Sequence, residues 1–155
     1  MPTNLLRQNR KATDKRSSTG LPGPTRTVDI IVGAITIRAN LLDTPTANRI
    51  WQALPIVSTI AVWGQEIHFE TEVESGRERG ARVLATLGDI AWVAEHDRVS
   101  IIYGPTPTSK PGELRLWSPA NIWARTLDDV TVLKAARPGE KVSIKAAPAV
   151  RAVTG

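Results

Sequence analysis

Apolar and polar residues alternate along several short stretches of the chain, and a period of two is typical of β-strands. The stretch 67–74 shows this pattern most clearly. One set of positions holds Ile67, Phe69, Thr71 and Val73, and the other holds His68, Glu70, Glu72 and Glu74. An antiparallel sheet can bury one face and leave the other in solvent. We therefore expect His68 and the three glutamates to be exposed.

Similar stretches recur along the chain, separated by residues that are favoured in turns. The predicted strands cover 28–32, 35–42, 58–63, 67–74, 90–93, 99–103, 114–117, 122–127 and 141–145. The sequence Ser118-Pro119-Ala120-Asn121 separates two of them. Many short strands with a turn about every 8–12 residues indicate a mainly β fold, as a closed barrel or a sandwich.

Two segments have the features of helices instead. Thr44 is a favourable N-cap, and Pro45 suits the first helical position, where its missing N–H is not needed. Apolar residues then recur at helical spacing until Pro55 ends the run. We predict one main helix at about 45–54 and a short second helix at about 128–136.

The positive charge of the protein is concentrated at its N-terminus. The sequence has 20 Lys and Arg against 15 Asp and Glu, and residues 1–26 hold six of the basic residues and one acidic residue. This leader is too polar to offset the entropy of ordering by burying apolar surface. We interpret it as a disordered, solvated leader or the product of an over-extended reading frame. The alternative is a basic arm for nucleic acid or another anionic surface.

Composition excludes several classes of protein. The chain has no Cys, which excludes disulfide frameworks, zinc ribbons and Cys nucleophiles. It has no run of about 18 apolar residues and no apolar signal segment. We expect a single domain at 27–147 with a C-terminal tail at 148–155, in a cytoplasmic protein without a membrane anchor, metal or cofactor. The oligomeric state stays open.

Five short motifs occur in a fixed order along the chain. They are Leu42-Asp43-Thr44-Pro45-Thr46-Ala47, Trp63-Gly64-Gln65-Glu66-Ile67, Gly88-Asp89-Ile90-Ala91, Gly104-Pro105-Thr106-Pro107 and Ser118-Pro119-Ala120-Asn121. Together they resemble the prokaryotic cyclophilin-like protein family over roughly residues 28–147. The resemblance implies a small closed β-barrel with one main helix and a short second helix. It implies no established reaction, and a shared fold does not determine function.

The resemblance raises peptidyl-prolyl cis-trans isomerase activity as an alternative. Cyclophilin isomerases use an Arg on the strand after the first helix and a hydrophobic pocket for the proline ring. Residues 50–76 of this chain contain no Arg or Lys. Arg49, Arg115 or Arg125 could replace the missing group only with a different geometry. A divergent isomerase therefore stays an alternative, and whether the chain is an enzyme stays open.

Five residues at predicted junctions of loops and strands are candidate ligand contacts. They are Trp63, Glu66, Tyr103, Thr106 and Asn121. A Trp offers a flat apolar surface with an N–H donor, and the carboxylate of Glu66 could bind a cation or act as a base. In the structural alternative, Trp63 packs at the barrel end and Glu66 caps a turn. We predict a pocket at the barrel rim for a small molecule or short peptide; a protein-interaction module is a further alternative.

Overall fold

The structure is a computed structural model that describes residues 26–148. The strands are β2 (Thr27–Val32), β3 (Ile35–Leu41), β4 (Ile56–Thr59), β5 (Ala61–Val62), β6 (Glu66–Glu70), β7 (Arg82–Ala85), β8 (Asp89–Val93), β9 (Arg98–Ile102), β10 (Leu114–Arg125) and β11 (Lys141–Ala146). The helices are the α-helix α1 (Pro45–Ala53) and the 3-10 helices η2 (Ala94–His96) and η3 (Val130–Ala135).

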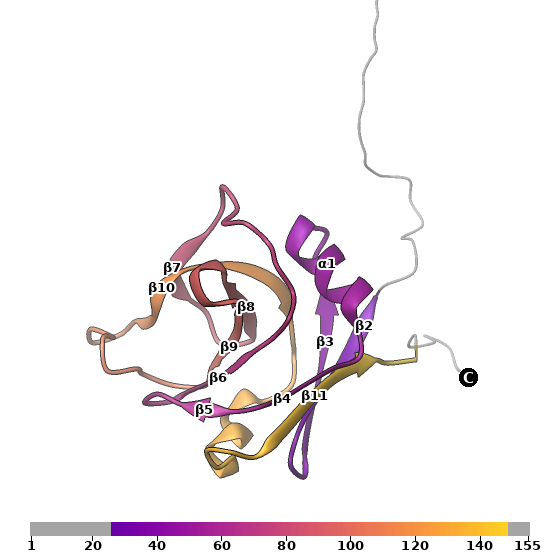
Figure 1. Cartoon of the computed structure of the whole chain (residues 1–155). Coiled ribbons are helices and arrows are strands. Elements are labelled where there is room, and N and C mark those ends of the chain that lie inside the picture. The colour runs from indigo at the N-terminus through magenta and orange to yellow at the C-terminus, as the bar shows by residue number, and fades with distance from the viewer. Residues whose placement is uncertain (1–25, 149–155) are drawn as a thin grey trace, which may run out of the picture.

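The strands form one antiparallel sheet that curls into a nearly closed barrel (Figure 1). Around the barrel the strands follow the order β4, β11, β2, β3, β10, β8, β9, β6, β5, and β7 pairs with β10 beside this path. β4 and β5 are therefore the two ends of the sheet. The prediction of a mainly β barrel with one main helix is confirmed.

The main hydrophobic core fills the barrel because each strand turns alternate side chains inward. Its members come from β2, β3, β4, β6, β8, β9, β10 and β11, with α1 and η3 packed on them. Trp92 and Trp123 are the largest of the fully buried side chains. Trp51 of α1 is half-buried against the same cluster.

A second, smaller apolar cluster lies on the opposite face of β8 and β9. It contains Ala91, Val93 and Ile102, whose neighbours along each strand point into the main core. The first half of β10 and the strand β7 cover this face. Trp117 packs against the cluster and lies 4.9 Å from the ring of His96.

The main helix agrees with its prediction to within one residue. The Thr44 side chain caps it by accepting a hydrogen bond from the Ala47 N–H at 3.1 Å. The second helix is the shorter 3-10 helix η3, and Asp129 caps it by accepting from the Thr131 N–H.

Several strand boundaries predicted from the sequence are wrong. The predicted strand 67–74 corresponds to β6 and ends at Glu70, the predicted strand 58–63 is divided between β4 and β5, and β7 was not predicted. The segment from Ser118 to Asn121 does not separate two strands, because β10 runs through it without a break. Its pairing with β7 is irregular between Arg115 and Ala120, which spans Pro119. A proline lacks an N–H and is tolerated where the ladder is interrupted.

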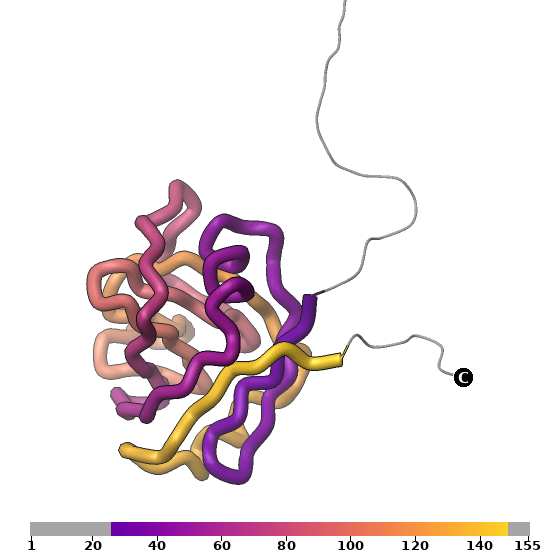
Figure 2. Tube along the Cα trace, turned by 45° about the vertical axis from the view of Figure 1, so that its right-hand side comes forward, coloured from indigo at the N-terminus to yellow at the C-terminus, as the bar shows by residue number. Residues whose placement is uncertain are grey.

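The described chain begins and ends on neighbouring strands (Figure 2). The Ala147 N–H donates to the Thr27 carbonyl at 2.8 Å. The predictions of a disordered leader and a C-terminal tail fall on residues 1–25 and 149–155, which lie outside the described residues. Between residues 26 and 148, no helix is long and apolar enough to cross a membrane.

Candidate functional site

Four of the five predicted site residues lie at one end of the barrel, where the turn 63–66 meets the loop 103–107. The Gln65 N–H donates to the Pro105 carbonyl at 3.1 Å, and the Tyr103 N–H donates to the Gln65 carbonyl at 2.8 Å. These bonds hold the turn and the loop together. We call this group the rim cluster: Trp63, Glu66, Tyr103 and Thr106.

The turn and the loop approach each other so closely that the turn requires glycine. Gly64 has a φ of +59°, in the left-handed region that other residues rarely adopt. A Cβ atom at this position would lie 2.7 Å from Cδ of Pro107. The loop 103–107, which contains Pro105 and Pro107, therefore touches the turn directly.

Glu66 is the most unusual residue of the rim cluster. Its side chain is 0% exposed and faces the second apolar cluster, because Glu66 pairs with Ile102 across β6 and β9. The Ser100 hydroxyl donates to Oε2, whereas Oε1 has no hydrogen-bond partner among the described residues. Burial raises the pKa of Glu66 to about 7, although the hydrogen bond from Ser100 acts in the opposite direction. A buried acid of this kind can exchange a proton near neutral pH.

His68 differs from its prediction as an exposed residue. Its side chain is half-buried, and Nδ1 accepts a hydrogen bond from Nε of Arg98 at 2.8 Å. Burial, followed by the charge of Arg98, lowers the pKa of His68 and favours the neutral imidazole. The prediction failed because Arg98 comes from β9, 30 positions further along the chain. Glu70, Glu72 and Glu74 are exposed as predicted.

The remaining polar groups of the rim cluster are used by the protein itself. The Thr106 hydroxyl donates to the Arg115 carbonyl at 2.5 Å, and the Ser109 hydroxyl accepts from the N–H groups of Thr106 and Arg115. Tyr103 is buried in the main core, and burial raises the pKa of its phenol. Both residues stabilise the loop, and Trp63 is left half-buried beside Glu66.

Asn121 lies apart from the rim cluster, with β8 and β9 between its strand and β6. Its amide donates to the Thr46 hydroxyl and the Gly76 carbonyl, both at 2.9 Å. Its oxygen accepts from the Glu78 N–H at 2.8 Å. Through these three hydrogen bonds the Asn121 side chain links the segment 75–78 to the start of α1.

A groove opens between the end of α1, β4 and the segment that continues β6. It has a volume of about 720 Å³. The residues that line it are Ala53, Pro55, Ile56, Val57, Ser58, Glu70, Thr71, Glu72 and Val73, and we call it the seam groove. β4 does not pair with the 70–73 segment here, so the groove marks a gap in the barrel wall.

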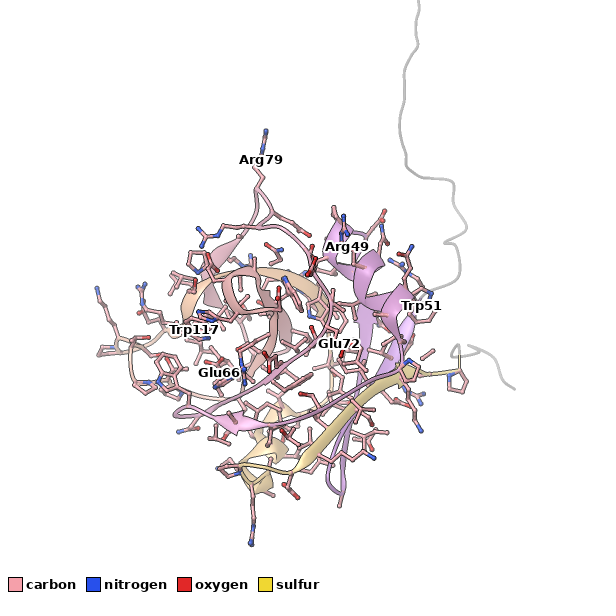
Figure 3. All side chains as sticks on the ribbon, viewed as in Figure 1. Arg49, Trp51, Glu66, Glu72, Arg79 and Trp117 are labelled. Atoms are coloured by element: carbon pink, nitrogen blue, oxygen red, sulfur yellow. The ribbon has the colours of Figure 1, made fainter. Side chains whose placement is uncertain are left out.

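The seam groove is acidic on one side and apolar on the other. Glu70 and Glu72 line it, and Glu72 also lines a second hollow of about 340 Å³ beside Arg49 and Glu74. Val57 faces outward with 61% of its surface exposed. Figure 3 shows Glu72 beside α1 and Glu66 farther from the helix, on the side of Trp117.

The sequence contains one signal for the seam groove, the glutamates of 67–74. The alternation of glutamates in 67–74 predicted that these side chains are exposed to solvent. It did not predict which element lies opposite them. The opposite wall of the groove is β4, which precedes the β5–β6 hairpin in the chain and pairs with β11 instead of β6. Such a gap is a property of strand pairing, which local patterns do not specify.

Comparisons with known proteins agree with this architecture. A family model described as Cyclophilin-like matches residues 26–145. The solution structure of the hypothetical protein AF2241 from Archaeoglobus fulgidus is similar, with a TM-score of 0.69 and 29% identity over 83% of this chain and 100% of that one. McbB in complex with tryptophan has a TM-score of 0.58 and 16% identity over 80% of this chain and 46% of its own, a likeness of fold alone. None of the curated proteins matches.

Proposed function

Because the chain belongs to the cyclophilin-like family, whose barrel here has an open seam, we propose that it binds a small molecule or a short peptide in the seam groove. The observation that carries the proposal is the groove itself. Its volume of about 720 Å³ falls within the roughly 300–1,000 Å³ that is typical of ligand sites. Apolar side chains from β4 face carboxylates from the opposite wall, which suits a ligand with both kinds of surface.

The test is to fill the groove and follow binding by amide NMR. Short peptides and small polar molecules would be titrated into the full chain. We expect shifts to concentrate at residues 53–58 and 70–73 and to disappear in Ala53→Trp, whose ring would occupy the groove. Ala135→Trp, at an exposed position on η3, is the matched control. Binding that survives Ala53→Trp in a folded protein would refute the proposal.

The rim cluster is a second candidate for the same function. The sequence predicts Trp63 and Glu66 as ligand contacts there. Two observations favour this site: Oε1 of Glu66 has no hydrogen-bond partner among the described residues, and Trp63 is half-buried. Shifts at 63–66 and 103–107 instead of the seam groove would assign binding to the rim. Trp63→Ala should then abolish binding and leave the melting curve nearly unchanged.

We assign no reaction to either site. Two of the three arginines considered as substitutes for an isomerase residue are engaged elsewhere: Arg115 pairs with Glu113, and Arg125 pairs with Asp89. Arg49, the third, lies on α1 and lines the hollow beside Glu72. Arg98 reaches the strand β6 but is hydrogen-bonded to His68. We expect no acceleration in a proline-peptide isomerisation assay. Turnover there would establish the isomerase alternative.

A further inference from the structure

One wall of the seam groove is a strand edge whose backbone groups have no partner strand. Among residues 26–148, β4 pairs only with β11 and ends the sheet. The Ile60 N–H donates to the Glu140 carbonyl, and the Ile60 carbonyl accepts from the Gly139 N–H. Backbone groups of an antiparallel strand alternate in direction, so those of Val57 and Thr59 point away from β11 and toward the groove.

The opposite wall also presents unpaired backbone groups. The Thr71 N–H donates to the Asp97 carbonyl, so residue 71 faces the β9 side. Glu70, the last residue of β6, then directs its backbone groups to the other side. β5 pairs with β6 only at Ile67 and His68, which leaves this edge without a strand partner in the described part of the chain.

The side chains add negative charge along the same wall. Glu70, at the end of β6, and Glu72, just beyond it, are exposed and line the seam groove, and Glu74 lines the neighbouring hollow. None of the three forms an ion pair with another residue between 26 and 148, and Arg49 is the one basic residue that lines the two hollows. Because alternate side chains of a strand lie on one face, Lys or Arg at alternate positions of a strand in the groove would face these glutamates.

We infer that the seam groove binds an extended segment of a partner polypeptide, with Lys or Arg at alternate positions, by strand addition. This inference rests on the proposed function and specifies its ligand. The segment pairs with the free edge of β4 through backbone hydrogen bonds, and its basic side chains face the glutamates. Exposed edges commonly recruit peptides in this way, with affinity from the backbone and specificity from alternate side chains.

The test compares matched probe peptides on the full chain by calorimetry and amide NMR. The first probe is a capped octapeptide of alternating lysine and valine. A second has glutamate in place of every lysine, and a third is the first probe N-methylated at every valine, which removes N–H donors and keeps the charge. We expect the N-methylated probe to bind at least tenfold more weakly and the acidic probe not to bind detectably.

A pair of single-charge variants tests the acidic wall. Glu72→Gln should weaken the lysine probe about three- to fivefold, the effect of one exposed ion pair. Asp43→Asn removes the same charge at an exposed position that does not line the groove, and should leave the affinity unchanged.

The outcomes separate this inference from the proposed function. If all three probes bind the groove equally, the groove is a peptide site but strand addition to a basic segment is refuted. If only small molecules shift residues 53–58 and 70–73, the ligand class is wrong and the proposed function stands. Five of the leader's six basic residues would also be changed to Gln: Arg7, Arg10, Lys11, Lys15 and Arg16. If the lysine probe binds only after this change, the groove is occupied by the chain's own leader and the inference of a separate partner is refuted.

Discussion

At the scale of single residues, Glu66 couples the folding of the barrel to pH. Its pKa is about 7 in the folded protein, and in the unfolded chain it returns to the ordinary value near 4.5. Well below pH 4.5 the acid is protonated in both states and does not lower the free energy of unfolding. As the pH rises from about 4.5 to about 7, only the unfolded state loses the proton, so folding is destabilised by up to about 3 kcal/mol.

Glu66→Gln should remove this dependence. The amide keeps the size of the side chain and an oxygen for the Ser100 hydroxyl but carries no charge. We expect the free energy of unfolding at pH 8 to exceed that of the wild type by about 1–3 kcal/mol, with little difference near pH 4.5. Urea denaturation at the two pH values measures it. Glu70→Gln, at the exposed end of the same strand, is the control, and an unchanged pH dependence in Glu66→Gln would contradict the assignment.

At the scale of elements, the contact between the turn 63–66 and the loop 103–107 decides whether the rim keeps its shape. Gly64→Ala introduces both a strained φ and a clash with Pro107. We expect it to destabilise the protein by about 2–3 kcal/mol. Gly112→Ala, with a φ of +81° but no atom within 4 Å, isolates the cost of the backbone at about 1 kcal/mol. Equal losses in the two variants, by thermal denaturation, would show that the contact with Pro107 is unimportant.

Asn121 makes a comparable junction between the segment 75–78 and α1. Asn121→Ala removes three hydrogen bonds and leaves the Glu78 N–H and the Gly76 carbonyl without partners, at a cost of about 3 kcal/mol. Hydrogen exchange should accelerate at 75–78 before the core strands are affected. Ser118→Ala, also on β10, serves as the control. Unchanged protection at 75–78 would contradict this function of Asn121.

The elements differ in how far the sequence determines them. α1 was predicted within one residue because its cap and its terminating Pro55 act locally. β10 was divided at Pro119 because the sequence does not show that the strand is irregularly paired there. The bonds of Asn121 span 43 to 75 positions, and the Arg98–His68 bond spans 30. Contacts at such separations come from the topology, so the rim cluster was predictable from its motifs whereas the partners of Asn121 and His68 were not.

At the scale of the whole molecule, the barrel should tolerate proline substitutions at β4 residues whose N–H faces the seam groove, but not at those whose N–H bonds β11. Val57→Pro removes an N–H that faces the seam groove, and we expect a loss below about 1 kcal/mol because proline is tolerated on free edges. Ser58→Pro removes an N–H that bonds β11 and should cost about 3 kcal/mol or more. Chemical denaturation compares them, and equal losses would mean that the seam is not open at β4.

The mainly β fold was predictable because most of its strands are short, β-branched and regularly interrupted, and the resemblance of the five motifs to the family favoured a barrel over a sandwich. The gap between β4 and the 70–73 segment was not, since both walls have ordinary strand sequences and the gap depends on the way the sheet ends.

The hydrogen bond between Ala147 and Thr27 holds the two ends of the described fold side by side. A domain with this property can be inserted between two adjacent residues of a host protein, because the host chain enters and leaves at one point and is not stretched. The domain can also be circularly permuted: its two ends can be joined and new ends opened at an exposed turn, and the order of strands in the sheet stays the same. The same barrel is therefore suited to serve as a module within larger chains.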